Sequence, residues 1–475
     1  MAYNNSSYSK EYKITKPHLD ELIHVEKSFD VMEKPLVIAG RQACYYFIDG
    51  FCKDEVMEKV MEHLFKLTPE DMPSSPEEFM NRHMPYGETN LIGNDKDFLQ
   101  SFMSGVPILF IDGYKMLIAT DFRTYPARSV DEPEKDKVMR GSRDGFVETV
   151  VFNTALIRRR IRNPELVMEI HSVGKSSKTD VVVSYIDGRV DPKVLKQVND
   201  RIAAIDVDSL TMNQESFIEC FYPHRWYNPY PKFKFSERPD TAAACILEGN
   251  VVILVDNSPN AIIVPTSIFD IVEDADDYYF PPITGTYLRL SRFIINLAAL
   301  LLSPTFLLLM NNPSFIPAGL EFIMIKDPIN VPIIIQLLLL EFAIDGMRLA
   351  SLNTPNMLST PLSVVAGIVL GDFTVSSGWF NSEIMLYMAF VAVANYTQVN
   401  FELGYALKFM RIITLVATQF FGIFGYIAGI VLAVVGIIFN KTFDGKSYLY
   451  PLIPFNARGL LRRFFRVSLP KSEKQ

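Results

Sequence analysis

The distribution of charged and apolar residues changes partway along this chain of 475 residues. As far as about Tyr279, charged and apolar residues are interspersed as in a soluble protein, whereas only eleven residues between Phe293 and Asn440 are charged. Three stretches carry no charge: residues 293–310, 384–401 and 412–440. An uncharged apolar run of about 18 or more residues is long enough to cross the hydrocarbon core as a helix. The pattern predicts a soluble half followed by a helical transmembrane half.

The soluble half contains a faint internal duplication. Each copy has a β-branched or aromatic run, then a helix-like stretch, then a second strand that ends in an acidic turn. These are residues 44–50 (CYYFIDG), 53–67 and 107–113 (PILFIDG) in the first copy, and 181–188 (VVVSYIDG), 191–205 and 251–257 (VVILVDN) in the second. Strands separated by amphipathic helices predict two small α/β lobes with a shared fold.

These patterns divide the chain into five parts. They are a flexible N-terminal segment (1–34), a first cytosolic lobe (35–140), a second cytosolic lobe (141–285), a helical membrane domain (286–440) and a basic cytosolic tail (441–475). The acidic run at 270–277 (DIVEDADD) is interpreted as a solvated linker that leads to the membrane. The predicted class is mixed α+β, with two α/β lobes followed by an α-helical transmembrane domain.

Charge is unevenly placed along the chain, whose formal net charge is −8. The tail at 441–475 has eight Lys or Arg against two Asp or Glu, so the remainder is distinctly acidic. An acidic protein lacks the basic face that nucleic-acid binding needs. A basic tail after an apolar run follows the positive-inside rule, and residues 1–30 have no apolar core of a signal peptide. Both observations place the lobes and the tail in the cytosol.

Motifs for catalysis and cofactor binding are missing. Residues 174–177 (GKSS) resemble the end of a phosphate-binding loop, but Glu169 occupies the position where that motif requires glycine. The six histidines are scattered, and the four cysteines form no CxxC pair. We therefore expect neither an enzyme nor a cofactor or metal site.

Arginines gather at the end of a helix-like stretch that begins near Asp144. Basic residues at a helix C-terminus complement the helix dipole, which is a purely structural explanation. They would also pair with acidic surface on a neighbouring subunit or with anionic lipid heads. The candidate oligomer-interface residues are Arg140, Asp144, Arg158, Arg159, Arg160 and Arg162.

The membrane half has five apolar segments, at 292–310, 331–350, 360–376, 384–401 and 412–439. Basic residues flank both ends of this array, which predicts that both ends are cytosolic and that the chain crosses the membrane an even number of times. Five crossing segments would not meet this requirement. Segment 331–350 is the best candidate for a re-entrant, interfacial or oligomer-packed element. Only its residues 329–340 are free of charge, and they span about 18 Å as a helix, too short to cross.

Charged and hydroxyl side chains in the second and third segments form the candidate pore lining. Glu341, Asp345 and Arg348 are three or four residues apart and share one helical face. Charges at membrane depth usually face a bundle interior or a water-filled path. An internal Asp–Arg pair that fixes packing, or a helix end among headgroups, explains them equally well. The pore-lining candidates are Glu341, Asp345, Arg348, Asn353, Thr354, Asn356, Ser359, Thr360, Ser363 and Asp372.

Two further features of the membrane half follow the fourth segment. Glu402, Lys408 and Arg411 are interpreted as a charged connector. In the last segment, Gly422 and the glycines at 425 and 429 are spaced for close helix approach, so packing explains them best.

Several motifs resemble those of one protein family. Residues 148–162 (ETVVFNTALIRRRIR), 345–349 (DGMRL) and 450–456 (YPLIPFN) look like the A subunit of the bacterial spore germinant receptors. The resemblance extends over about residues 35–466. Residues 352–355 (LNTP) and 453–461 (IPFNARGLL) point to a branch of receptor-like paralogues linked to dipicolinic-acid release genes.

The resemblance implies a protein of the spore inner membrane, with its lobes and basic tail on the spore-core side. It implies a homo-oligomer, a pentamer, around an ion-conducting pore that releases ions and amplifies the germination signal. It also implies contact with membrane lipid, a small membrane partner protein and other germination proteins. The alternative is a non-conducting receptor or scaffold subunit that organises germination complexes.

Overall fold

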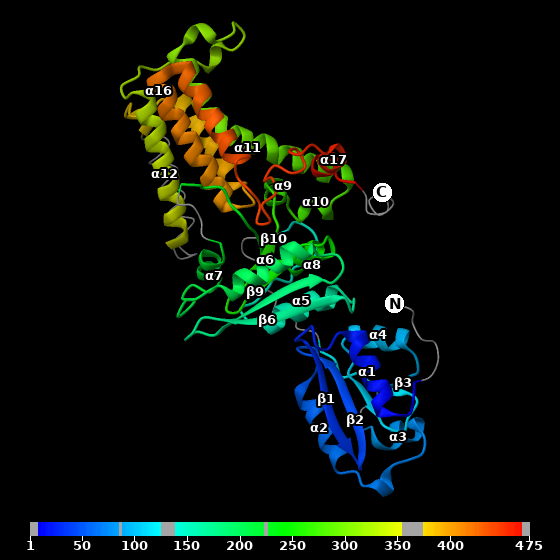
Figure 1. The fold of residues 1–475 in the computed structure, drawn as a ribbon. Coiled ribbons are helices and arrows are strands. Elements are labelled where there is room, and N and C mark those ends of the chain that lie inside the picture. The colour runs from blue at the N-terminus through cyan, green and yellow to red at the C-terminus, as the bar shows by residue number, and fades with distance from the viewer. Residues whose placement is uncertain (1–7, 85–87, 125–137, 223–226, 354–373, 468–475) are drawn as a thin grey trace. The chain divides into compact units, whose positions relative to one another are not determined.

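The structure, a computed structural model, describes residues 8–84, 88–124, 138–222, 227–353 and 374–467. Figure 1 shows its helices and strands. The chain forms two compact units: Met1–His224 with Phe233–Pro265, and Arg225–Lys232 with Thr266–Gln475. The first unit holds two β-sheets, and the second holds the long helices.

The first lobe is a five-stranded sheet with helices on both faces. Its elements are α1 (Tyr12–Ile23), β1 (Val31–Ile38), β2 (Arg41–Ile48), α2 (Asp54–Phe65), α3 (Pro76–His83), β3 (Thr89–Ile92), α4 (Asp95–Met103), β4 (Ile108–Ile111) and β5 (Leu117–Thr120). Alternate residues of β2 serve the two faces: Cys44 and Tyr46 pack with α1 and α4, and Tyr45 packs with α2 and α3.

The second lobe repeats this arrangement. Its elements are α5 (Val150–Arg160), β6 (Leu166–Val173), β7 (Thr179–Ile186), α6 (Pro192–Ala203), α7 (Gln214–Phe221), β8 (Lys234–Ser236), α8 (Pro239–Leu247), β9 (Val251–Val255) and β10 (Ala261–Val264). The strand orders are β1-β2-β4-β5-β3 and β6-β7-β9-β10-β8, so each strand of the second sheet occupies the place of the strand five numbers earlier. The predicted duplication is confirmed.

The α/β description of the lobes is wrong, because every neighbouring pair of strands in both sheets is antiparallel. β1 and β2 form a hairpin whose two turn residues, Ala39 and Gly40, both have positive φ, as this type of tight turn requires. Helices cover both faces of the first sheet, so its central strands carry buried apolar residues on both faces and lack alternation. Such strands look like those of a parallel sheet.

Residues 8–34, expected to belong to a flexible segment, fold with the first lobe, which corrects that expectation. Leu19, Leu22 and Ile23 are spaced three and four apart on α1 and are buried in the core that includes β2 and α4. The His18 ring lies 3.0 Å from Asp95 at the start of α4. This helix therefore belongs to the first lobe.

The second unit is helical. Its principal helices are α9 (Ile268–Val272), α10 (Asp276–Tyr279), α11 (Pro282–Asn311), α12 (Ile333–Asn353), α15 (Ser382–Tyr396), α16 (Phe401–Ile438) and α17 (Ala457–Phe464), with a short α14 (Thr374–Ser376). Residues 266–285, expected in the second lobe, lie in this unit, because Ile271 and Val272 pack against Leu300 and Leu403. Among the described residues, α11 and α16 are long and apolar enough to cross a membrane.

Helix α16 is a hairpin rather than the single span expected for residues 412–439. Gly422 has φ 57° and ψ −133°, which breaks the helix into arms 401–421 and 423–438. A Cβ atom on Gly425 would lie 1.9 Å from the Ala417 carbonyl oxygen, and one on Gly429 would lie 2.5 Å from the Thr414 hydroxyl. The arms, about 32 and 24 Å long, therefore run antiparallel in close contact, as the orange helices of Figure 1 show.

The helical unit has the polarity expected in lipid. Large apolar side chains are exposed on each long helix, among them Ile294, Phe342, Phe390 and Phe424. Three charged side chains on α12 and α16 are buried, namely Glu341, Lys408 and Arg411. This inverts the usual order of a soluble protein and suits helices that face hydrocarbon.

Candidate functional site in the helical unit

The centre of the site is a buried ion pair between α12 and α16. Arg411 donates from Nε to Oε1 of Glu341 at 2.5 Å and from Nη2 to Oε2 at 2.8 Å. The Arg411 side chain is fully buried, and that of Glu341 is 3% exposed. Two parallel hydrogen bonds between a guanidinium and a carboxylate fix both distance and orientation.

Arg411 also reaches a third helix. Its Nη1 donates to the carbonyl oxygen of Ala299 on α11 at 2.5 Å. Five residues further on, Pro304 lies inside α11 and has no N–H to offer the carbonyl of Leu300. The proline therefore loosens the helical hydrogen bonds of α11 beside the carbonyl that Arg411 binds.

A second pair lies one turn away. Lys408 contacts the carboxylate of Asp345 and donates to the Glu341 carbonyl oxygen at 3.2 Å. The acidic residues are four apart on α12 and the basic residues three apart on α16, so each pair shares a helical face. The Asp345 side chain is 34% exposed, unlike the other three members.

The Arg348 guanidinium packs against two aromatic rings. Its guanidinium carbon is 4.5 Å from the ring centre of Phe401 and 5.2 Å from that of Tyr405. These are cation–π distances. Arg348 itself lines a surface pocket together with Asp345, Lys408 and the two rings. Asp345 is thus a charged side chain within a pocket, whereas Glu341 is closed off.

The structure divides the pore-lining candidates into three groups. Glu341, Asp345 and Arg348 are placed as described, and Asn353 ends α12. The candidates Thr354, Asn356, Ser359, Thr360, Ser363 and Asp372 lie outside the described residues. An Asp–Arg pair within one helix was expected to fix the packing. The buried pair observed instead joins Glu341 of α12 to Arg411 of α16. The interpretation of residues 402–411 as a charged connector is also wrong, because Lys408 and Arg411 lie inside α16.

The structure also divides the oligomer-interface candidates into buried and exposed residues. Arg158 is buried: its Nε and Nη2 donate to Asp30 at 2.8 Å each, and Nη1 donates to the Leu166 carbonyl at 3.0 Å. It holds the segment before β1 to the start of β6, which corrects its assignment to an exposed interface.

The other members of that group lie nearer the surface. Arg160 donates to Asp144 at 2.6 Å. Partial burial opposes ionisation of Asp144, but the Ser142 hydroxyl and the Arg160 guanidinium outweigh it and lower the pKa of this carboxyl to about 2. Arg140, Arg159 and Arg162 are exposed. They remain the residues whose position suits contact with another molecule.

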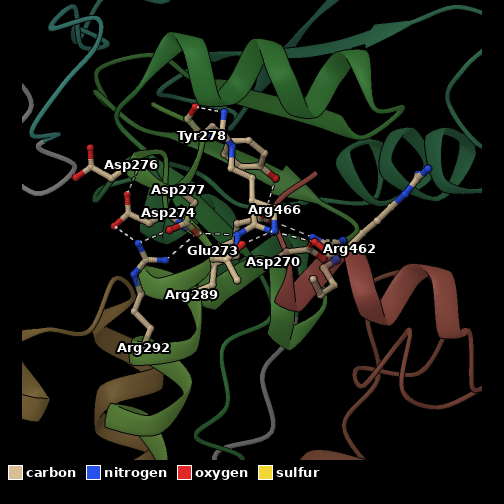
Figure 2. Close-up of polar contacts among 12 residues, drawn as sticks. Asp270, Glu273, Asp274, Asp276, Asp277, Tyr278, Arg289, Arg292, Arg462 and Arg466 are labelled. Carbon is tan, nitrogen blue, oxygen red and sulfur yellow. Dashed lines mark hydrogen bonds and ion pairs between the residues drawn. The ribbon is translucent and has the colours of Figure 1, made fainter. Parts of the chain in front are cut away.

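A second charged cluster lies at the start of α11 (Figure 2). Arg289 donates to Glu273 at 2.6 Å and to Asp277 at 3.2 Å, and Arg292 donates to both oxygens of Asp277 at 2.7 and 2.8 Å. Asp277 is fully buried. The acidic run is therefore not a solvated linker: α10 and the residues before it are held against α11 by its arginines.

The C-terminal tail joins this cluster. Arg463 pairs with Asp270 at 2.5 Å and with Glu273 at 2.8 Å, and Arg289 donates to the Arg462 carbonyl at 2.9 Å. Figure 2 shows residues of α9 to α11 and of the tail meeting at one place. Sequence reasoning explained the basic tail and the acidic run separately. Their opposite charges were the available indication that they pair.

Within the described ranges, no group of three or more His, Cys, Asp or Glu side chains is placed to hold a metal ion. The buried ion pairs described above join different helices of the unit. Such an arrangement can fix helix packing, and at Asp345 it presents charge to a pocket.

An apolar-surfaced helical unit with charges inside, joined to a unit of two matching antiparallel lobes, defines a membrane-associated class of protein. The chain belongs to the GerA family, since the model described as Bacillus/Clostridium GerA spore germination protein matches residues 18–475. The family predicted from the motifs is thereby confirmed.

Known relatives cover nearly the whole chain. Stage V sporulation protein AF of Bacillus subtilis (strain 168) is 33% identical over 469 residues, which is 98% of this chain and 94% of that protein. Spore germination protein A1 of the same strain is 26% identical over 454 residues, covering 95% and 93% of the two chains. The branch predicted from the additional motifs is the one that contains stage V sporulation protein AF.

A solved structure also matches. It is the crystal structure of the N-terminal domain of the A subunit of the Bacillus megaterium spore germinant receptor GerK3. The match covers 54% of this chain and 96% of that one, with 25% identity and a TM-score of 0.42.

Proposed function

We propose that this spore germination protein is a subunit of an oligomeric ion channel in the spore inner membrane. In this proposal it releases ions and amplifies the germination signal. Copies of the chain, five in number, surround the path together with a small membrane partner protein. The lobes and the basic tail face the spore core.

The observation that carries the proposal is the unequal exposure of the two carboxylates on α12. The Glu341 side chain is 3% exposed and paired, whereas the Asp345 side chain is 34% exposed and lines a pocket. Charge held within an apolar helical unit and presented to a pocket is what an ion path requires. The described helices are too few to enclose such a path in one copy, so neighbouring copies would supply the remaining wall.

The test is flux through the reconstituted full chain. The purified oligomer is placed in liposomes, and leak of monovalent cations and anions is measured for the native protein and for Asp345→Asn. Asp327→Asn, which removes an exposed carboxylate before α12, is the matched control. Flux changed by Asp345→Asn alone supports the channel. An intact oligomer that conducts nothing contradicts it.

A non-conducting scaffold is the second candidate, and the Glu341–Arg411 pair favours it. That pair is closed, and Arg411 also holds the Ala299 carbonyl, so these groups tie three helices together. A scaffold predicts association with other germination proteins without permeability. Co-purification with such partners from spores, beside the liposome leak, separates the two functions.

A further inference from the structure

Helix α17 has two distinct faces. Toward the protein, the Phe464 ring packs against Phe293 of α11 at 4.9 Å and against Phe269 of α9 at 6.1 Å between ring centres. The helix starts at a cap, where the Asn456 side chain accepts from the Gly459 N–H at 3.0 Å. Its position is therefore fixed by its inner face.

The outer face combines arginine with large apolar side chains. Leu461 and Arg462 follow Arg458 by three and four residues, so these three share one face of α17. Phe465 follows the end of the helix, and all four side chains are exposed. Leu461 is 58% exposed, and Phe455 in the preceding turn is 72% exposed. Basic residues interspersed with exposed apolar residues on one helical face are typical of a segment lying in a membrane interface.

The arginines of this segment have two different roles. Arg463 is committed to the cluster with Asp270 and Glu273. The Arg462 backbone carbonyl accepts from Arg289, while its side chain extends away from the cluster (Figure 2). The cluster therefore fixes the helix, and Arg458 and Arg462 present their charge outward.

The outer face is next to the candidate membrane span. The Arg466 N–H donates to the Thr286 hydroxyl in the first turns of α11 at 3.1 Å. That end of α11 exposes Ile283, Tyr287 and Ile294 along one side. The apolar surface of α17 and its preceding turn therefore lies at the end where α11 would enter the bilayer.

We propose that α17 and the turn before it lie on the membrane surface and bind anionic phospholipid headgroups through Arg458 and Arg462. The negative surface of such a membrane complements the outward arginines, and its headgroup boundary accommodates the apolar side chains between them. The occupant is the bilayer that α11 enters. This inference rests on the proposed membrane placement and is independent of ion conduction.

The test uses tryptophan fluorescence of the full chain in vesicles that contain brominated lipid. In a background with Trp226→Phe and Trp379→Phe, single tryptophans are introduced as Leu461→Trp, Leu297→Trp and Met212→Trp. Leu297 is exposed on α11 and Met212 is exposed on the second lobe. We expect quenching at 461 by bromine near the headgroups, quenching at 297 and none at 212.

Two failures are distinguishable. Quenching at 297 without quenching at 461 would overturn the α17 proposal and leave the membrane placement intact. No quenching at 297 would overturn the membrane placement and with it the proposed function.

The headgroup charge is tested separately. Vesicles of phosphatidylcholine alone are compared with vesicles that contain phosphatidylglycerol, for the native arginines and for Arg458→Gln with Arg462→Gln. The ratio of bound to unbound α17 should fall about fivefold for each arginine removed, and only in the anionic vesicles. Lys446→Gln, which removes an exposed charge of the same tail, should have no effect. Equal quenching in both kinds of vesicle would overturn the assignment of anionic lipid.

Discussion

Arg411 holds Glu341 through two hydrogen bonds of 2.5 and 2.8 Å, although 70 residues separate them in the chain. The same guanidinium binds the Ala299 carbonyl, so one side chain connects α11, α12 and α16. Both ionised groups are buried, and loss of Glu341 leaves the Arg411 guanidinium with the Ala299 carbonyl but without its carboxylate, whereas Glu341 also has the Lys408 Nζ 3.8 Å from its Oε2. The stability of the helical unit should therefore depend strongly on this pair.

Glu341→Gln should destabilise the helical unit. It leaves the Arg411 charge buried without its carboxylate, which costs about 3–5 kcal/mol. Thermal unfolding of the purified protein in detergent measures the loss, with the exposed Glu321→Gln as control. The double variant Glu341→Met, Arg411→Met removes both charges and should recover most of the stability. Unchanged stability in Glu341→Gln would show that the pair does not hold the helices.

Arg158→Met should destabilise the first unit. It leaves Asp30 buried and unpaired, with an expected loss of about 3–5 kcal/mol in the free energy of unfolding. Its exposed neighbour provides the control, since Arg159→Met should change stability by less than about 0.5 kcal/mol. Denaturant unfolding of both variants gives the comparison. A larger loss of stability in Arg159→Met than in Arg158→Met would contradict the burial of Arg158 and support its assignment to an exposed interface.

Gly425→Ala should separate the arms of the α16 hairpin. Its Cβ would lie 1.9 Å from the backbone oxygen of Ala417, which cannot move without moving the helix. Gly346 on α12 has nothing within 4 Å of a Cβ, so Gly346→Ala should be harmless or stabilising by up to about 1 kcal/mol. Melting temperatures in detergent should fall for the first variant only. Equal melting temperatures would contradict the hairpin contact.

Two of the four thiols should resist alkylation in the folded chain. Burial raises the pKa of the Cys44 and Cys52 thiols to about 12, and the thiolate is the reactive form. At about pH 8 their thiolate fraction is roughly a thousandfold below that of an ordinary cysteine. Cys52, Cys220 and Cys245 are all partly exposed, and Cys44 is buried. A maleimide should therefore label Cys220 and Cys245 before Cys52, because the pKa of the Cys52 thiol is raised, and should label Cys44 last. Peptide mapping by mass spectrometry measures the order, and labelling of all four in concentrated urea is the control. Rapid labelling of Cys52 would contradict the raised pKa of its thiol.

The repeated lobes could be predicted because α2 and α6 bury residues at helical spacing after strands of similar composition. The antiparallel pairing could not, since β2 is apolar on both faces and alternation is what distinguishes a half-buried strand. In the first lobe, α1 was missed although Leu19, Leu22 and Ile23 have helical spacing. The surrounding charge concealed it.

The sequence predicted the acidic residues of the candidate site but not their basic partners. The spacing of Glu341 and Asp345 placed both on one helical face, as observed. Their partners were missed, because Lys408 and Arg411 were grouped with Glu402 outside the helix that contains them. The sequence did contain an indication of this pairing. Two acidic residues lie four apart in one apolar stretch, and two basic residues lie three apart in a neighbouring one. The turn at Gly422 depends on a backbone conformation that spacing does not reveal.

The bond between Arg289 and the Arg462 carbonyl also constrains how the chain threads the bilayer. Arg289 precedes the apolar part of α11, and Arg462 follows α11 and α16, the described helices long enough to cross a membrane. The Arg289 Nη1 and the Arg462 carbonyl oxygen nevertheless lie 2.9 Å apart. If α11 crosses a bilayer as proposed, two atoms in contact share one face of it, so the polypeptide between them crosses an even number of times. A reporter inserted before α11 and one fused after α17 should then report the same compartment.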